Sequence, residues 1–232
     1  MAKAMPAAVA VVGCGGKTTL IEALADEFRD RKVLISPTTK ILPPHGNIVN
    51  RVTLEESSSH IPAAGIQCLG ALNEATGKLE ALPPPVLEGM IRQYDLALLE
   101  ADGSNGLPCK GWREDEPAVP EYCDFTLGVV TPSAVGKPAG AETTLRLKEF
   151  TAITGLEAGR PITVQALARM VCAKDGMFRR NAGKLCVFVN GAEDAETAAR
   201  AEELLRYIRR ESPGRFSLLA YGSALRNEWV SV

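Results

Sequence analysis

The sequence contains very few histidines and no closely spaced pair of cysteines. Among its 232 residues there are two histidines, and no two of its six cysteines stand in a C-x-x-C spacing. Structural zinc sites are usually built from such cysteine pairs and histidines, so the sequence predicts no zinc site. Single, scattered thiols are typical of a reducing compartment, where they mostly serve as small buried hydrophobic residues. We therefore expect a cytoplasmic protein.

The sequence also has little net charge and no long hydrophobic run. Its 26 basic and 28 acidic side chains leave a net charge of −2, which offers no electrostatic basis for binding nucleic acid or an anionic membrane. No apolar run approaches the roughly 20 residues of a membrane-spanning helix. Residues 1–12 are mildly apolar and lead directly into a glycine-rich loop, so they predict a first strand rather than a signal peptide. We expect neither nucleic acid nor a membrane among the partners.

The composition is that of an ordinary globular protein. Hydrophobic residues make up 46% of the sequence and charged residues 23%, and a chain of this length is able to bury a sizeable core. The sequence shows no internal repeat, no low-complexity tract and no clear linker. These features predict one domain spanning residues 1–232.

Apolar runs typical of buried strands alternate with segments of helical periodicity. In the first helical segment Leu20, Leu24 and Phe28 recur every four residues and so share one face. This alternation predicts an α/β three-layer sandwich with a mostly parallel sheet. A small insertion is expected to be a β-hairpin, in which two short strands flank a turn containing glycine. The expected main strands are residues 7–12, 32–35, 96–99, 125–130, 185–189 and 216–221; the hairpin strands are 66–69 and 78–81, around a turn at 73–77; the helices are 19–29, 85–94, 142–153, 164–172 and 195–210.

A glycine-rich loop, G-C-G-G-K-T-T, stands between the first expected strand and the first expected helix. Glycines let consecutive backbone N–H groups turn toward phosphate oxygens, and the dipole of the following helix adds to the attraction. Lys17 would reach the β- and γ-phosphates, and the hydroxyl of Thr18 would ligate Mg²⁺. The strict G-x-x-x-x-G-K-[ST] pattern is not met, because Val11 stands where its first glycine belongs. The loop predicts a P-loop NTPase-like fold in which the nucleotide is held by Gly13, Cys14, Gly15, Gly16, Lys17, Thr18 and Thr19.

A second motif ends the apolar run at residues 96–99 with two carboxylates, Glu100 and Asp102. It has the form of a Walker B strand, which delivers carboxylates to the edge of the sheet where ligands bind in open α/β folds. One carboxylate would hold Mg²⁺ directly or through water, and the other would orient a nucleophile. A solvated strand end is the alternative. We therefore expect Lys17, Glu100 and Asp102 to be catalytic, and Thr18, Glu100 and Asp102 to be metal ligands.

Further loops carry candidates for contacts to a second substrate or for a nucleotide-responsive switch. The loop at residues 36–40 follows an expected strand and so lies near the same edge of the sheet. The glycine-rich loop at residues 103–112 contains a lysine that suits an anionic second substrate. Lysines that converge on the γ-phosphate would favour a kinase or ligase, whereas plain turns and solvated lysines are the alternatives. The candidates are Thr38, Thr39, Lys40, Lys110 and Lys137.

The strand at residues 185–189 ends at Asn190, where guanine-specific NTPases carry an N-K-x-D motif. Asn190 matches this motif and would contact the base, but Gly191 replaces the lysine and Glu193 stands at the aspartate position. Rejection of adenine relies on an acid that accepts from both guanine donors, and the longer side chain of Glu193 shifts its carboxylate. We therefore expect weak discrimination between ATP and GTP. An Asn-Gly turn followed by acidic residues at a helix start is the alternative.

Together these motifs resemble the YqeC family, whose members are accessory proteins of selenium-dependent molybdenum hydroxylases. The resemblance spans about residues 8 to 210 and rests on the loop at residues 13–19 together with T-T-K-I, L-L-E-A-D-G, G-K-P and V-N at residues 38–41, 98–103, 136–138 and 189–190. The segment at residues 144–146 departs from it, because no histidine precedes the arginine. Locally, the short loop also resembles that of the Mur ligases, and the glutamate-ended strand that of dethiobiotin synthetase.

The resemblance implies a P-loop NTPase fold and a role in the maturation of selenium- or molybdenum-containing hydroxylases. Together with the glycine-rich loop and the two carboxylates, it predicts an accessory protein that binds and hydrolyses ATP or GTP with Mg²⁺. Its partners would be a nucleoside triphosphate and such a hydroxylase or its cofactor-maturation proteins. Two alternatives stay open. One is a small-molecule kinase or ATP-dependent ligase, and the other is a nucleotide-gated protein-binding module without significant turnover.

Overall fold

The computed structural model describes residues 7–41, 49–52 and 64–232. Its main strands are β1 (Ala7–Gly13), β2 (Lys32–Pro37), β3 (Val49–Val52), β4 (Gly65–Leu69), β7 (Leu96–Glu100), β9 (Phe125–Val130), β11 (Lys184–Asn190), β12 (Leu218–Ser223) and β13 (Glu228–Ser231). They form one nine-stranded sheet in the order β13-β12-β11-β9-β1-β7-β2-β4-β3. All neighbours pair in parallel except β12 and β13. The predicted mostly parallel sheet is confirmed.

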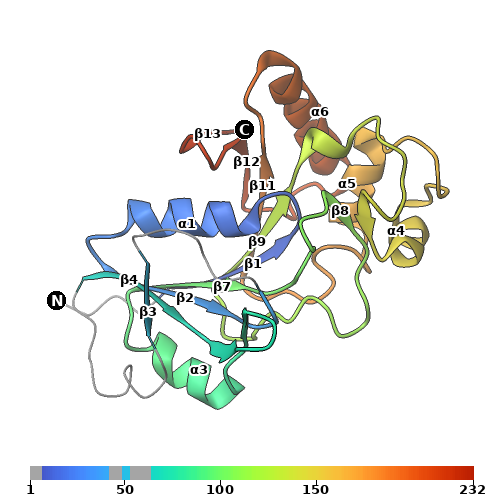
Figure 1. The fold of residues 1–232 in the computed structure, drawn as a ribbon. Helices are drawn as coiled ribbons and strands as arrows, with labels where there is room; N and C mark the ends of the chain where they lie inside the picture. The colour runs from blue at the N-terminus through green and yellow to red at the C-terminus, as the bar shows by residue number, and fades with distance from the viewer. Residues whose placement is uncertain (1–6, 42–48, 53–63) are drawn as a thin grey trace.

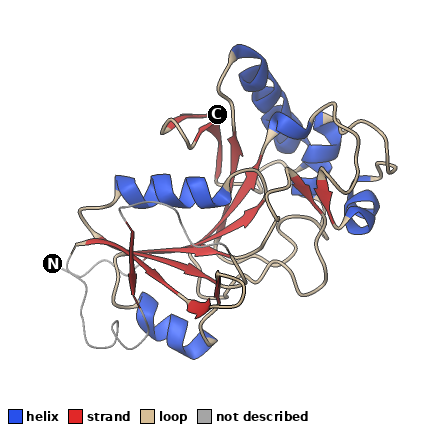
Figure 2. Cartoon of the chain, viewed as in Figure 1, coloured by secondary structure: helices blue, strands red, loops and turns tan. Residues whose placement is uncertain are grey.

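Helices cover both faces of this sheet (Figures 1 and 2). The helices among the described residues are α1 (Lys17–Glu27), α3 (Pro84–Ile91), α4 (Leu147–Thr154), α5 (Val164–Cys172) and α6 (Ala195–Glu211). Val11 of β1 belongs to a core with α1, whereas its neighbours Ala10 and Val12 belong to a core with α3, α5 and α6. Successive side chains of a strand point to opposite faces, so the three layers follow from this alternation. None of the described helices combines the length and apolar character needed to cross a membrane.

The predicted β-hairpin is present, but one of its expected strands is wrong. The hairpin consists of β5 (Ala71–Asn73) and β6 (Lys78–Glu80), which pair antiparallel around the expected turn. Residues 66–69 instead belong to β4, which pairs in parallel with β2. Ile66, Cys68 and Leu69 are buried, so this segment has apolar side chains on both faces and fits the interior of the main sheet rather than an exposed hairpin.

Several elements differ from the sequence-based expectation. Phe28 lies just beyond α1 and is 39% exposed, while Leu20, Ile21 and Ala25 form the buried face of the helix. The helix expected over residues 142–153 starts later, because Thr144 and Leu145 form strand β10 and pair with β8 (Cys109–Lys110). Strand β13 was not predicted, because its residues are exposed and carry no buried pattern.

Because the strands run parallel, their carboxyl ends meet at one edge of the sheet. The register sets Glu100, the last residue of β7, beside Val11 of β1 on one side and Pro37 of β2 on the other. The chain builds the half of the sheet beyond β7 first and then crosses to β9 on the other side of β1. The glycine-rich loop therefore lies at the point where strand order reverses, which is where open α/β sheets bind ligands.

A pair of glycine substitutions tests this packing. Gly128 lies in β9, and a Cβ there would lie 2.5 Å from both Met177 Sδ and Phe178 Cζ, whereas a Cβ at Gly89 in α3 would meet nothing within 4 Å. We expect Gly128→Ala to lower the free energy of unfolding by about 1–3 kcal/mol through overpacking. Gly89→Ala should raise it by about 0.5–1 kcal/mol, because alanine favours the helix. Urea denaturation of both variants measures these values, and equal effects would contradict the packing described.

Candidate functional site

The glycine-rich loop turns sharply between β1 and α1. Gly15 and Gly16 have φ angles of 93° and 105°, which side chains of L-residues rarely adopt. A Cβ at Gly15 would lie 2.4 Å from Thr131 Cγ2, and one at Gly16 would lie 2.3 Å from Asn190 Nδ2. Gly16 is also the N-cap of α1, and no side chain accepts a hydrogen bond at this cap. The loop therefore admits only glycine at both positions and leaves the helix start without a side-chain cap.

Lys17, the first residue of α1, is buried beside two carboxylates. Its Nζ donates to the carbonyl oxygen of Gly13 over 2.7 Å and lies 3.4 Å from Asp102 Oδ1 and 3.8 Å from Glu100 Oε1. Burial alone would lower the pKa of Lys17, but the charges of Asp102 and Glu100 outweigh burial and raise that pKa. Lys17 is therefore a charged ammonium held against the glycine loop.

Glu100 forms a hydrogen bond with the hydroxyl group that follows this lysine. Its Oε2 accepts from Thr18 Oγ1 over 2.9 Å, and the residue is 6% exposed. Burial raises the pKa of Glu100, because it outweighs the opposing effects of Lys17 and of the Thr18 hydrogen bond. A hydroxyl and a carboxylate oxygen thus lie together, and both are ligand types that Mg²⁺ prefers.

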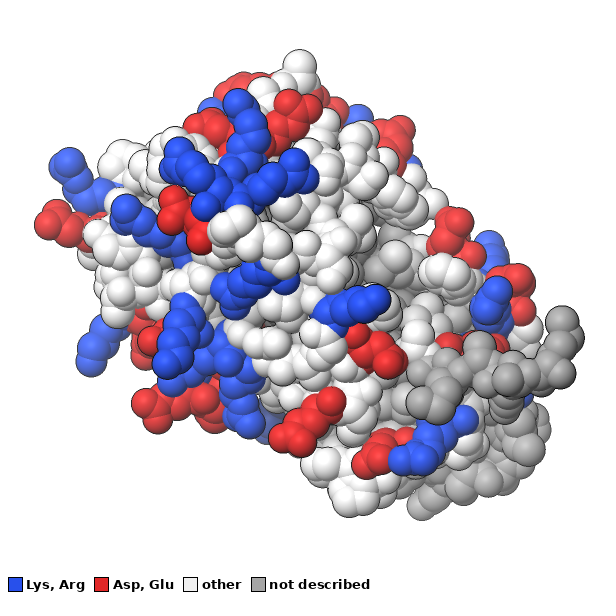
Figure 3. Space-filling model, turned by 180° about the vertical axis from the view of Figure 1, so that it is seen from behind, with Lys and Arg blue, Asp and Glu red and all other residues white. Residues whose placement is uncertain are grey.

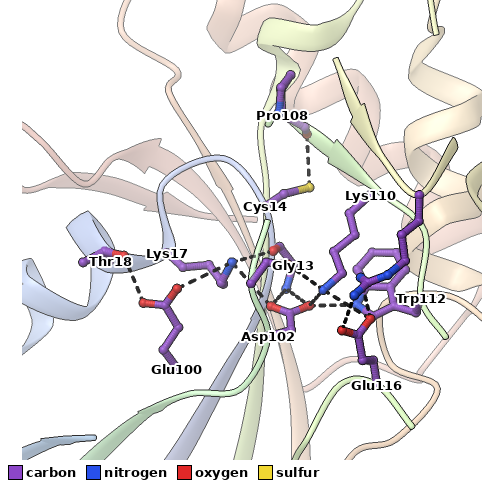
Figure 4. Close-up of polar contacts among 12 residues, drawn as sticks. Gly13, Cys14, Lys17, Thr18, Glu100, Asp102, Pro108, Lys110, Trp112 and Glu116 are labelled. Carbon is purple, nitrogen blue, oxygen red and sulfur yellow. Dashed lines mark hydrogen bonds and ion pairs between the residues drawn. The ribbon is translucent and has the colours of Figure 1, made fainter. Parts of the chain in front are cut away.

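Asp102 is held by four donors in the interior (Figure 4). The backbone N–H of Gly13 donates to its two oxygens over 3.0 and 3.2 Å, and Trp112 Nε1 donates to Oδ2 over 2.7 Å. Lys110 Nζ lies 3.2 Å from Oδ2, and Lys17 Nζ contacts Oδ1. Both oxygens of Asp102 face protein donors, and its side chain is 0% exposed. Of the two carboxylates, Glu100 is therefore the one better placed to contact a metal ion.

Behind Asp102 the charge network continues into residues that sequence reasoning did not assign to the site. Lys110 Nζ donates to the carbonyl oxygen of Gly103 over 2.7 Å and lies 3.6 Å from Glu116 Oε2. Arg146 Nη2 donates a hydrogen bond to Glu116 Oε1 over 2.7 Å, and Arg146 Nη1 forms an ion pair with Glu116 Oε2 over 2.6 Å. Trp112 stood in the glycine-rich loop noted in the sequence, but Glu116 lies in an ordinary polar stretch and gave no signal.

The side chain of Asn190 connects the glycine-rich loop with the turn that follows β12. Its Nδ2 donates to the carbonyl oxygen of Gly15 over 2.8 Å, and its Oδ1 accepts from the backbone N–H of Ala224 over 2.9 Å. The neighbouring Glu193 accepts from Ser223 Oγ over 2.9 Å. Both polar ends of the Asn190 side chain are therefore engaged with backbone groups.

A cavity of about 280 Å³ opens beside Lys17, Thr18 and Glu100. Of the second-substrate candidates Lys40 lines this cavity, together with Lys78, which the sequence did not single out. Its full lining is Gly16, Lys17, Thr18, Thr19, Lys40, Ile41, Lys78, Glu100, Gly103, Ser104, Asn105 and Gly106.

The other candidates lie elsewhere in the described structure. Thr38 donates to the carbonyl oxygen of Ala118 over 2.7 Å and lines a separate cavity, while Lys110 is fully buried. Thr39 is half-buried and Lys137 is exposed, and neither lines the cavity beside Lys17. The structure therefore does not bring Lys40, Lys110 and Lys137 together on that cavity.

The two cysteines nearest the loop are protected thiols. Cys14 is fully buried, and its Sγ donates to the carbonyl oxygen of Pro108 over 3.1 Å. Burial raises the pKa of the Cys14 thiol to about 12 and also raises the pKa of Cys109. Because the thiolate is the reactive form, the raised pKa values disfavour nucleophilic reactions of Cys14 and Cys109.

Neutralising Asp102 should lower the free energy of unfolding more than neutralising Glu100. Asp102→Asn leaves Lys17 and Lys110 buried against a neutral group, and breaking such a buried pair costs about 3–5 kcal/mol of the free energy of unfolding. Glu100→Gln removes a more distant ion pair of 3.8 Å and should cost about 1 kcal/mol. Chemical denaturation without nucleotide compares the two variants with the wild type. Similar losses would mean that Asp102 does not have the structural role described.

Comparison with known proteins identifies the family of this chain. The model of the family described as "YqeC protein" matches residues 9–148, which include the glycine-rich loop, both carboxylates and Arg146. A protein of Escherichia coli (strain K12) described as "Uncharacterized protein YqeC" is 30% identical over 217 residues, covering 88% of this chain and 84% of that protein. The chain therefore belongs to the YqeC family.

Proposed function

We propose that this protein binds Mg²⁺ with ATP or GTP at residues 13–19 and catalyses transfer of the γ-phosphoryl group, to water in the simplest case. The observation that carries this proposal is Lys17, a buried ammonium held between the glycine loop and two carboxylates. We further propose that the reaction serves the maturation of selenium- or molybdenum-containing hydroxylases in the cytoplasm. That role rests on the family resemblance, and the partner would be such a hydroxylase or its maturation proteins.

The phosphate loop offers an anion two kinds of attraction. The start of α1 lacks a side-chain cap, and uncapped N–H groups at a helix start, together with the helix dipole, favour a phosphate. Lys17 is already charged and lies next to the loop, so its Nζ would exchange contacts with the carbonyl oxygen of Gly13 and with Asp102 for contacts with the β- and γ-phosphates. These residues bind the triphosphate and stabilise the negative charge that develops on the leaving diphosphate.

The residues at the loop fit Mg²⁺. Thr18 Oγ1 and Glu100 Oε2 are 2.9 Å apart and would hold the ion directly or through water, as is usual for a cation that is bound largely by phosphate oxygens and waters. Among the described residues no group of three His, Cys, Asp or Glu side chains forms a metal site, and a phosphate-bound Mg²⁺ does not require one. When bound, the ion would neutralise charge on the transferring phosphoryl group.

The charge distribution suits a mononucleotide better than a polynucleotide. On the described part of the face drawn in Figure 3, Lys and Arg side chains gather toward one side, but Asp and Glu lie among them. The net charge of the chain is −2. Nucleic-acid binding draws most of its affinity from many lysine and arginine contacts to phosphates, so this mixed surface supports a small nucleotide as the ligand.

The nucleotide part of the proposal is tested first with Lys17→Ala. Loss of a hydrogen-bonding cation from the β- and γ-phosphates should weaken ATP and GTP binding at least about tenfold. Calorimetry with a non-hydrolysable triphosphate measures this, and Lys148→Ala, which removes an exposed lysine of α4, is the control. Unchanged affinity in a folded Lys17→Ala protein would rule out the proposed phosphate site.

The same titration, repeated with and without Mg²⁺, tests the proposed metal site. Glu100→Gln should abolish most of the gain in nucleotide affinity that Mg²⁺ produces, because it removes the carboxylate that faces Thr18. Nucleotide binding without Mg²⁺ should change little in this variant. A Mg²⁺ dependence equal to that of the wild type would mean that the ion is held elsewhere.

The contacts of Asn190 predict an effect that does not depend on the base. Asn190→Ala frees the carbonyl oxygen of Gly15 and the N–H of Ala224, so it should loosen the loop and weaken ATP and GTP binding by similar factors. In the wild type the two affinities should differ by less than about a hundredfold. A competition titration measures both, with Glu193→Gln as the comparison. A selective loss of GTP binding in either variant would show that these side chains read guanine.

A further inference from the structure

The cavity beside the phosphate loop extends well past the residues that a triphosphate requires. Its described lining combines Lys17, Thr18 and Glu100 with Lys40, with Lys78 of the β5–β6 hairpin and with the turn at residues 103–106. Three lysines and one carboxylate line this space among the described residues. The described lining therefore carries a net positive charge.

Lys40 and Lys78 differ in whether an acidic side chain already pairs with them. Lys40 Nζ lies 2.8 Å from Glu80 Oε1, and this contact lowers the pKa of the Glu80 carboxyl. Within the described part of the chain Lys78 has no ion-pair partner, and its backbone N–H binds Thr76 in the hairpin turn. Of these two lysines, Lys78 is therefore the one whose charge is available to an anionic ligand.

The residues that line the cavity also restrict which chemical groups could accept a γ-phosphoryl group there. Among the described residues of the lining, Glu100 is the one carboxylate and its Oε2 already accepts from Thr18, and none of these described residues is a histidine. A hydroxyl acceptor needs a base within hydrogen-bond reach to take its proton. A carboxylate or phosphate oxygen is already anionic and needs none, but it must approach a charged γ-phosphate, and nearby cations offset that repulsion.

We propose that the hairpin side of this cavity is an acceptor subsite for a small molecule carrying a carboxylate or phosphate group, held chiefly by Lys78. This inference rests on the proposed nucleotide site. An oxygen of the bound oxyanion forms a bond to the γ-phosphorus, while the bond from that phosphorus to the β,γ-bridging oxygen breaks. The electron pair stays on the departing nucleoside diphosphate, Lys17 stabilises its charge, and no proton is removed. The product is an acyl phosphate or a phosphoanhydride.

The test uses two methyl-bearing probes, acetate for a carboxylate and methylphosphonate for a phosphate. Each is titrated into the full chain with Mg²⁺ and the β,γ-imido analogue of ATP, and saturation-transfer difference NMR reports its Kd. We expect Lys78→Gln to weaken binding of at least one probe at least about tenfold, Lys78→Arg to retain it, and Lys148→Ala to leave it unchanged. Glu80→Gln should tighten it, because Lys40 is then no longer neutralised.

The outcomes separate this inference from the proposed function. If the ATP analogue does not bind, the proposed nucleotide site is wrong and the subsite falls with it. If the analogue binds but neither probe does, or if Lys78→Gln binds both as the wild type does, the subsite is overturned while the nucleotide site stands. An unchanged probe Kd in Glu80→Gln would show that Glu80 does not weaken probe binding by neutralising Lys40. The probe that responds identifies the acceptor as a carboxylate or a phosphate.

Discussion

The buried carboxylate of Asp102 is the contact on which the arrangement of the site depends. A charge that is removed from water is costly unless it is paired and hydrogen-bonded, and Asp102 meets this condition with the N–H of Gly13, the indole of Trp112 and two lysines. These partners come from the glycine-rich loop, from α1 and from the segment that follows β7. One carboxylate thus fixes the glycine loop against the strand end and keeps Lys17 charged in the interior.

The two carboxylates of the strand-end motif therefore have different physical roles. Both oxygens of Asp102 contact protein donors, whereas Glu100 accepts one hydrogen bond, from Thr18, lies 3.8 Å from Lys17 Nζ and faces the cavity. Burial raises the pKa of Glu100, so a cation placed beside Thr18 would also stabilise its ionised form. A sequence motif with two acids two residues apart describes both in the same way, although Asp102 holds the glycine-rich loop and Glu100 faces the cavity.

The network behind Asp102 also bears on the alternative of a nucleotide-gated binding module. When Lys17 turns toward a phosphate, Asp102 would rely more on Lys110, which also contacts Glu116. Glu116 in turn holds Arg146, the residue before α4. A charge shift at the phosphate loop would thus reach the region of β8, β10 and α4 through direct contacts, and this region would be the one to change its affinity for a partner.

Several features of this protein were determined by the sequence alone, because they depend on local patterns. Apolar runs, helical periodicity and the glycine loop predicted six strands of the main sheet, five helices and the meeting of residues 13–19 with Glu100 and Asp102 at one edge. The tertiary structure alone decided that residues 66–69 join the main sheet, that Lys110 is buried while Lys78 lines the cavity, and that Glu116 and Arg146 belong to the network. The reason is physical: periodicity encodes which face of an element is apolar, whereas the pairing of charges and the exposure of a lysine depend on distances between segments far apart in the chain.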